Sequence, residues 1–325
     1  MQTATGYIYQ DFTDPIHTRL GVRDTGLCLG VSKMENYSMS NPRSNQMYAS
    51  FFGLKERPFS LLPDPEFIYW SPQHNRAFLV LEYGVMSKAP ITLITGEIGA
   101  GKTTLVQKLL SQMQDDTTIG LISNAQGGRG ELIQWTLNAL HVEVDPHTSY
   151  VQMFQALQDF LLEEYSAGRG VVLIFDEAQN LSLEGLEELR MLTNINSNKD
   201  VLVQLILVGQ PELRDMVRNP NMKQLAQRIA ANFHLSAMSA RTTIEYIAHR
   251  LRTAGGSGQE FTQQACRRVF KETNGVPRLV NQLCDFAMLY AWSAEEPIVT
   301  ERVIIKILED GVYMGPTDIT EEDTV

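Results

Sequence analysis

The sequence predicts an α/β fold with a mostly parallel five-stranded sheet, followed by a small all-helical domain. Apolar and β-branched runs alternate with stretches of helical spacing over residues 90–239. Strand signals then stop, and residues 240–312 carry only helical periodicity. A glycine-rich segment joins the first apolar run to the first helical stretch, as in proteins that bind phosphate groups.

Five short apolar runs are predicted as strands, and helical stretches separate them. The strands are expected at 91–95, 118–123, 171–176, 201–209 and 232–238. The run VVLIFD at 171–176 has no polar alternation, as expected of a strand covered on both faces. Helices are expected at 102–113, 131–142, 151–168, after Ser182, and at 211–217, with a loop between the last of these and the fifth strand. Four more are expected at 240–256, 262–275, 277–296 and 300–311.

The rest of the chain divides by composition. Residues 1–46 are polar without periodicity, which predicts a poorly ordered leader, and Met47 offers an alternative start. Residues 47–89 place aromatic rings between prolines, which predicts an ordered segment that clamps onto the α/β domain. The tail, 313–325, is acidic and is expected to be frayed.

Composition and charge exclude several classes of protein. The 325 residues are 43% hydrophobic and 20% charged, as in ordinary globular proteins, and the net charge of -11 disfavours a broad basic face for nucleic acid. The three cysteines form no CxxC pair, so neither a zinc site nor a disulfide framework is indicated. No apolar run reaches the ~18–20 residues of a membrane span, and no secretory signal is present, so a cytoplasmic location is expected.

The segment GEIGAGKT matches the pattern GxxxxGK[ST] and lies between a predicted strand and a predicted helix. In such a loop the backbone N–H groups and the helix N-terminus bind phosphate oxygens, which predicts a site for ATP with Mg²⁺. Lys102 is expected to reach the β- and γ-phosphates, Thr103 to bind Mg²⁺, and Thr104 to assist at the α-phosphate. The predicted nucleotide-binding residues are Gly96, Glu97, Ile98, Gly99, Ala100, Gly101, Lys102, Thr103 and Thr104.

Two further strands end in polar side chains. Asp176 at the end of VVLIFD is expected to hold Mg²⁺, and Glu177 to orient and polarise the attacking water. The alternative is that this pair caps the next helix. Gln210 follows the strand 201–209, where a side chain can face the γ-phosphate in the sensor-1 role; taken alone, it is more typical of a turn.

These motifs resemble the bacterial AAA+ ATPases of the general secretion pathway protein A type, the ExeA-like family. The resemblance rests on GEIGAGKTT, VVLIFDEAQNL, LILVGQPEL, LAQRI and NGVPRLVNQLCD, and on the opening MYASFFGLKERPFSLLPDPEFIYWSPQH. It runs from about Met47 to about Gly311. It implies an AAA+ P-loop NTPase whose phosphate-loop strand is central in the sheet and whose helical domain is a lid over the nucleotide.

The resemblance also implies roles for three more residues. Arg228 in LAQRI takes the arginine-finger position, which serves a neighbouring subunit and therefore implies a homo-oligomer, ring or filament. Arg278 in GVPRLVN takes the sensor-2 position. The alternatives are an exposed helix residue for Arg228 and a surface salt bridge for Arg278. His74 lies where the family has a histidine, near the expected adenine edge, although a capping or packing role is favoured. If Arg228 is not the finger, the remaining candidates are Arg214, Arg218 and Arg241.

Family members that assemble secretins continue into a membrane span and a peptidoglycan-binding domain, whereas this chain stops after the lid and tail. The resemblance then implies an ATPase core that acts on a protein partner in envelope, secretion, pilus or exopolysaccharide assembly, peripheral at the inner membrane through that partner. The alternative is a DNA-binding regulator of transposition target selection. That alternative needs a basic surface, and the candidates on the lid are Arg250, Arg252, Arg267, Arg268 and Lys271. A nucleotide switch without turnover is disfavoured by Glu177.

Overall fold

The computed structural model describes residues 48–315, apart from Pro63 and residues 114–115, 124–129, 146 and 198–199. The predicted leader, 1–46, and all but the first three residues of the predicted tail lie outside the described residues. The predicted domain boundaries stay predictions. Among the described residues, no helix combines the length and apolarity that crossing a bilayer requires.

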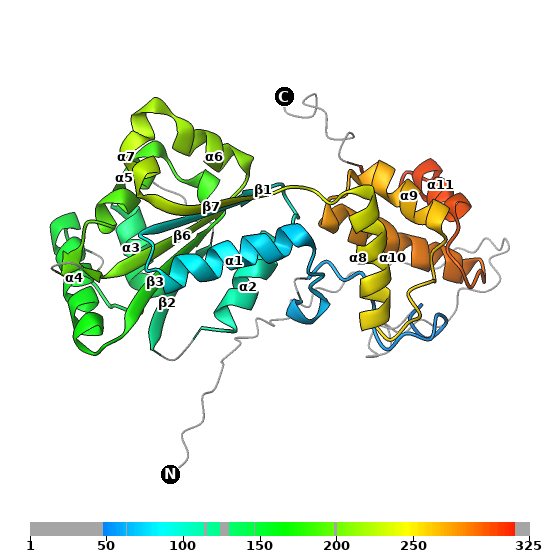
Figure 1. Ribbon diagram of the computed structural model, residues 1–325, viewed down its shortest axis with the longest axis horizontal. Coiled ribbons are helices and arrows are strands. Elements are labelled where there is room, and N and C mark those ends of the chain that lie inside the picture. The colour runs from blue at the N-terminus through cyan, green and yellow to red at the C-terminus, as the bar shows by residue number, and fades with distance from the viewer. Residues whose placement is uncertain are drawn as a thin grey trace, which may run out of the picture. The chain divides into compact units, whose positions relative to one another are not determined.

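A parallel five-stranded sheet forms the centre of the α/β part, as predicted (Figure 1). Its strands are β1 (Ile91–Gly96), β2 (Thr117–Ser123), β3 (Gly170–Asp176), β6 (Val203–Gly209) and β7 (Ile229–Leu235), in the order β2-β3-β6-β1-β7. The central strand is therefore β6. The expectation of a central phosphate-loop strand was wrong in this detail, because only β7 lies beyond β1. Since β6 lies between β1 and β3, the polar residues that follow all three strands meet at one edge of the sheet.

Both faces of the sheet are covered by helices, which explains the unbroken apolar strands. Along β3, Val171, Leu173 and Phe175 pack on one side, and Val172 and Ile174 on the other, with the two-residue period of a strand. The second side is covered by α1 (Pro72–Met86) and α2 (Lys102–Leu110). The first side is covered by α3 (Glu131–Ala139), α4 (Tyr150–Ser166), α5 (Leu183–Leu192), α6 (Pro211–Arg218) and α7 (Lys223–Arg228).

The structure differs from the sequence prediction at the short elements. The run 201–209 is divided: β6 starts at Val203, and Asp200–Val201 (β5) pairs instead with Asn196–Ser197 (β4) in a separate two-stranded antiparallel sheet. The fifth strand is 229–235 rather than 232–238. The predicted loop before it contains α7, whose six residues bury only Leu225 and so show no helical period. The described residues also form the 3₁₀ turns η2 (Pro65–Phe67), before α1, and η3 (Ala178–Asn180) and η4 (Pro220–Met222), within the α/β part.

Four helices follow the sheet, as predicted. They are α8 (Ala240–Thr253), α9 (Gln263–Thr273), α10 (Pro277–Ser293) and α11 (Glu301–Glu309). Ser239 and Thr262 cap α8 and α9 by accepting a backbone N–H with their side chains. Asn274 ends α9 in the left-handed conformation, at φ 48°. Because α10 starts only three residues later, its first turn is brought next to the phosphate loop, where the backbone N–H of Arg278 donates to the carbonyl of Gly99 at 3.2 Å.

The aromatic segment before α1 packs on the helical part rather than on the sheet. Tyr48, Leu54, Phe59 and Phe67 belong to the buried cluster formed by α8–α11. Asp285 on α10 accepts hydrogen bonds from the Tyr48 hydroxyl and the Arg57 guanidinium. The buried apolar side chains of residues 48–67 thus complete the core of the helices, while η2 contacts both α2 and α8, and the clamp onto the α/β domain stays a prediction for the segment as a whole.

This packing predicts a large loss of stability when Phe59 is truncated. Phe59 is fully buried and meets Phe261 edge to face, with ring centroids 5.8 Å apart. Phe59→Ala should lower the free energy of unfolding by about 3–5 kcal/mol. Chemical denaturation measures this value. The matched control is Leu62→Ala in the same segment, since that side chain is 78% exposed and its loss should cost less than ~0.5 kcal/mol. Equal effects of the two changes would contradict the packing.

Candidate nucleotide site

The phosphate loop connects the carboxyl end of β1 to the first turn of α2. Gly99 and Gly101 have φ of 75° and 98°, in the left-handed region that glycine adopts without strain. A Cβ on Gly99 would lie only 2.4 Å from the Cβ of Arg278, so a larger residue would displace the start of α10. The loop precedes a nine-residue helix, whose N-terminus favours negative charge. This cradle fits the phosphate groups of a nucleotide.

Lys102 is the buried cation of the loop, with 5% of its surface exposed. Its Nζ donates to the carbonyl oxygens of Gly96 at 2.8 Å and Glu97 at 3.0 Å. Burial lowers the pKa of this amine, whereas the nearby carboxylates of Glu177 and Asp176 act to raise it. The ammonium therefore lies at the base of the loop, where phosphate oxygens can replace backbone carbonyls as its partners.

Thr103 and Asp176 meet across the gap between α2 and β3. The Thr103 hydroxyl donates to Asp176 Oδ2 at 3.0 Å, and the backbone N–H of Glu177 donates to Oδ1 at 3.0 Å. Burial raises the pKa of the Asp176 carboxyl, although these hydrogen bonds partly oppose the shift. A hydroxyl and a carboxylate beside a phosphate cradle are oxygen donors of the kind that Mg²⁺ prefers. The residues present thus fit the Mg²⁺ of a bound nucleotide.

Glu177 lies next to Asp176 with left-handed backbone angles, φ 56° and ψ 38°. Its Oε2 accepts hydrogen bonds from the side-chain amides of Gln179 at 2.6 Å and Gln210 at 3.1 Å. Burial acts to raise the pKa of this carboxyl, but the two amide hydrogen bonds and the charge of Lys102 lower it, and the net pKa lies below its ordinary value. Glu177 is therefore held ionised, and Gln210, at the end of β6, contacts it directly.

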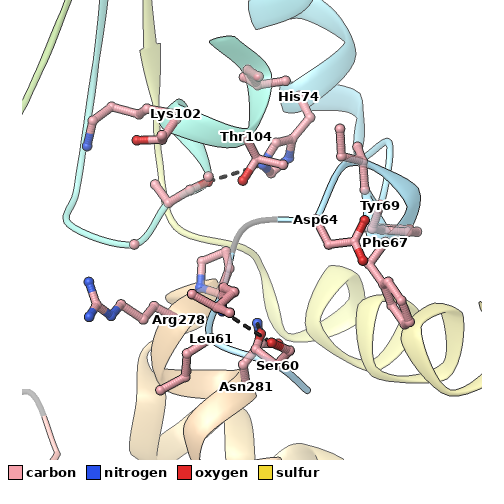
Figure 2. A pocket seen from close by; sticks show the side chains of 18 of the residues that line it. Ser60, Leu61, Asp64, Phe67, Tyr69, His74, Lys102, Thr104, Arg278 and Asn281 are labelled. Atoms are coloured by element: carbon pink, nitrogen blue, oxygen red, sulfur yellow. Dashed lines mark hydrogen bonds between the residues drawn. The ribbon is translucent and has the colours of Figure 1, made fainter. Parts of the chain in front are cut away.

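A cavity of about 210 Å³ opens between the phosphate loop and the first turn of α10. Figure 2 shows Lys102 and Thr104 on the phosphate-loop side and Arg278 and Asn281 on the helical side. Phe67 and Tyr69 line it from the segment before α1, and Glu177 also reaches it. The cavity therefore joins the predicted phosphate and metal ligands to an apolar region that can receive a base.

Sequence similarity to known proteins identifies the family of the chain. The AAA domain family model matches residues 85–217. General secretion pathway protein A of Aeromonas hydrophila is 38% identical to the chain over 247 residues. The chain belongs to the ExeA-like family of AAA+ ATPases. The matched residues are 76% of this chain but 45% of the relative, so the chain spans less than half of that protein's length.

Solved structures with this fold have much lower identity to the ExeA-like chain. Drosophila ORC bound to DNA gives a TM-score of 0.61 at 14% identity, covering 89% of this chain and 71% of that one. The ORC2 protein of Aeropyrum pernix, in ADPNP and ADP complexes, gives 0.55 at 17%, covering 75% and 71%. The Walker-type ATPase of Pyrococcus abyssi gives 0.55 at 19%, covering 78% and 76%. At these identities the likeness shows the AAA+ fold, a parallel sheet followed by a helical domain.

Two residues that the ExeA-like resemblance singles out lie at the cavity. Arg278 lines it from the first turn of α10, with an exposed side chain. His74 accepts or donates at both ring nitrogens: Nδ1 lies 2.7 Å from the Ser71 hydroxyl and Nε2 lies 3.1 Å from the carbonyl oxygen of Ala100. A carbonyl can only accept, so Nε2 carries a proton. His74 thus packs α1 against the phosphate loop, and burial lowers its pKa.

Arg228 does not line the cavity of its own chain. It lies at the end of α7, half-buried, and its Nη2 donates to the side-chain oxygen of Asn194. Among the other candidates, Arg241 pairs with Glu245 at 2.9 Å, and Arg214 and Arg218 lie on α6. The position of Arg228 outside its own site is compatible with a role at a neighbour's site.

The structure places two residues at or beside the site that the sequence analysis did not assign there. Gln179 contacts both Glu177 and the backbone of Gln210, and its signal was its place two residues after the carboxylate pair in DEAQ. Arg250 was grouped with surface cations, but it is only 7% exposed and stacks over Phe67, 4.8 Å from the ring centroid. Its spacing from Tyr246 and Ile247 places it on the buried face of α8, where the segment before α1 covers it, so the charge of the residue was misleading and its helical position was the usable signal.

Proposed function

We propose that this chain binds ATP with Mg²⁺ and hydrolyses it to ADP and phosphate. The observation that carries the proposal is the hydrogen bond between Thr103 and Asp176, with Glu177 beside it and Lys102 at the base of the same loop. Bound Mg²⁺ would neutralise charge on the phosphates, and Thr103 and Asp176 would hold it. Lys102 binds the β- and γ-phosphates, and Thr104 assists at the α-phosphate. Glu177 accepts the proton of the attacking water.

Three other residues complete the proposed site. Gln210 contacts Glu177 and acts as the sensor of the γ-phosphate. Arg278 takes the sensor-2 role from the first turn of α10, where its backbone N–H is hydrogen-bonded to the phosphate loop. Arg228 acts on the site of the neighbouring subunit, as an arginine finger stabilises charge that develops in the transition state. Glu177, Gln210, Arg228 and Arg278 are thus the proposed catalytic residues.

Lys102→Ala tests the site itself. The change should abolish ATP binding, because a buried phosphate cluster loses its main positive partner. Calorimetric titration with ATP at fixed Mg²⁺ measures the affinity. The matched control is Lys108→Ala, two turns further along α2, which should bind ATP as the wild type does. Equal ATP affinity in the wild type and Lys102→Ala would refute the site assignment.

We further propose that the protein works as a nucleotide-dependent homo-oligomer on a protein partner in bacterial envelope assembly. Support comes from the 38% identity to General secretion pathway protein A. The partner belongs to a secretion, pilus or exopolysaccharide system, and it holds the ATPase at the cytoplasmic face of the inner membrane. Exchange of subunits between inactive variants, described in the Discussion, tests the oligomer.

The alternative, a DNA-binding regulator of transposition, has less support. Of the lid cations that could form a basic surface, Arg250 is buried and Arg268 pairs with Glu272 at 2.6 Å. Burial keeps Arg250 from phosphates of DNA, the charge of Arg268 is partly neutralised by Glu272, and the chain carries a net charge of -11. Titration with duplex DNA discriminates the two: an affinity that falls steeply with rising salt would favour the alternative.

A further inference from the structure

Gln179 joins the end of β6 to the carboxylate of Glu177. It lies in η3, the single turn between β3 and α5, which packs against β6 and α6. Its Oε1 accepts from the backbone N–H of Gln210 at 3.0 Å, and its Nε2 donates to Glu177 Oε2 at 2.6 Å. The side-chain amide of Gln210 donates to the same oxygen at 3.1 Å. The three residues thus form a closed ring of hydrogen bonds.

The orientation of the Gln179 amide follows from its partners. A backbone N–H can only donate, so the atom that faces Gln210 must be the oxygen. The nitrogen then faces Glu177, whose ionised carboxylate can only accept. Reversing the amide would place its NH₂ donor against the Gln210 N–H donor and its oxygen against the Glu177 carboxylate. The hydrogen-bonded ring therefore has one stable arrangement.

The backbone at the end of β6 lies close to the side chains of the hydrogen-bonded ring. A Cβ on Gly209, the last residue of β6, would lie 2.9 Å from Gln179 Oε1 and 2.7 Å from the Leu213 side chain, so a larger residue there would displace one of these side chains. Glu177 itself has φ 56°, a conformation that costs energy for a residue with a side chain. Strained backbone held by surrounding contacts is typical of functional sites.

We propose that Gln179 is the positioning residue of Glu177, fixing its carboxylate against the end of the β6 strand. Two amides bind Oε2, and among the described residues no hydrogen bond to Oε1 is present. Oε1 is therefore the oxygen that receives the proton of the attacking water, and a movement at the end of β6 reaches the carboxylate through Gln179 as well as through the side chain of Gln210. This inference rests on the proposed role of Glu177 as the base.

Two substitutions distinguish the hydrogen bond that Gln179 accepts from Gln210 from the one that it donates to Glu177. Gln179→Glu keeps an oxygen that can accept from the Gln210 N–H but replaces the donor to Glu177 with a second carboxylate. Gln179→Leu loses both contacts. Hydrogen exchange of the Gln210 backbone amide, measured in nucleotide-free protein, should match the wild type in Gln179→Glu and be about tenfold faster in Gln179→Leu, on the scale of one lost hydrogen bond. This measurement does not depend on hydrolysis.

Steady-state kinetics then decides the role. Both variants should lower kcat about 100-fold, the usual effect of misplacing a catalytic group, with KM for ATP within about twofold of the wild type. If Gln179 only supported the fold, activity would follow amide protection, and Gln179→Glu would be as active as the wild type. That result, or unchanged kcat in Gln179→Leu, would overturn the proposal.

A control and a reference variant keep the two proposals apart. Gln204→Leu removes a side-chain amide from the same strand, where Nε2 bonds the carbonyls of Gly84 and Val85, and it should leave kcat within about twofold. The positioning role alone would be refuted if the wild type hydrolyses ATP, Glu177→Gln is inactive and both Gln179 variants are fully active. Wild type that fails to hydrolyse ATP, or an active Glu177→Gln, would refute the proposed function instead.

Discussion

Glu177→Gln should bind ATP with an affinity within about twofold of the wild type and turn it over at least ~100-fold more slowly. The amide has nearly the shape of the carboxylate, so the hydrogen-bonded ring with Gln179 and Gln210 can still form in part. It cannot accept a proton from water at neutral pH, however, so the chemical step loses its base. Binding should not need this group, because the proposed phosphate contacts are Lys102 and the loop backbone.

Single-turnover hydrolysis of pre-bound ATP is the measurement that isolates this step. Steady-state rates alone could be limited by product release. The matched control is Glu184→Gln, in the exposed first turn of α5, which should hydrolyse ATP as the wild type does. Wild-type single-turnover rates in Glu177→Gln would exclude Glu177 as the base.

The sheet and the phosphate loop could be predicted from the sequence because their signals are local. An unbroken run such as residues 171–176 indicates a strand covered on both faces, and the structure buries the whole of this run. The segment 96–103 carries its own glycine pattern, and two of its glycines, Gly99 and Gly101, have positive φ. The meeting of Asp176 and Thr103 is consistent with this, since the carboxyl ends of all the strands of a parallel sheet share one edge, although β6 lies between β1 and β3.

The parts that could not be predicted depend on contacts between distant segments. Phe59 is buried by helices about 200 residues further along the chain, and no local pattern shows on which domain its ring packs. The charge of Arg250 suggests exposure, although its spacing is that of the buried face of α8, and its partners, Phe67 and the carbonyl of Pro58, come from a distant segment. Gln179 contacts Gln210 across 31 positions, so its function appears only when β3 and β6 lie side by side.

Arg228→Ala should bind ATP normally and hydrolyse it about 10³-fold more slowly, because an arginine finger contributes ~10³–10⁵ to the rate. Arg228 contacts Asn194 in its own chain and does not line its own cavity, so the proposed finger would have to act on a neighbour's site. Specific activity of the wild type should therefore rise with protein concentration. The matched control is Arg302→Ala on the helical part, since that side chain is 89% exposed and should be dispensable.

Mixing two inactive variants tests the shared site directly. In a mixture of Arg228→Ala and Glu177→Gln subunits, some interfaces combine an intact Glu177 with an intact Arg228 from the neighbour. Random assembly at equal amounts makes roughly a quarter of the sites complete, so the mixture should recover about that fraction of wild-type activity. If Glu177 and Arg228 of one chain served the same site, every site in the mixture would carry one of the two defects and no activity would return. If each site combines residues from two exchangeable subunits, activity must return. Full activity of Arg228→Ala at every concentration would exclude it as the finger and direct the same test to Arg214, Arg218 or Arg241.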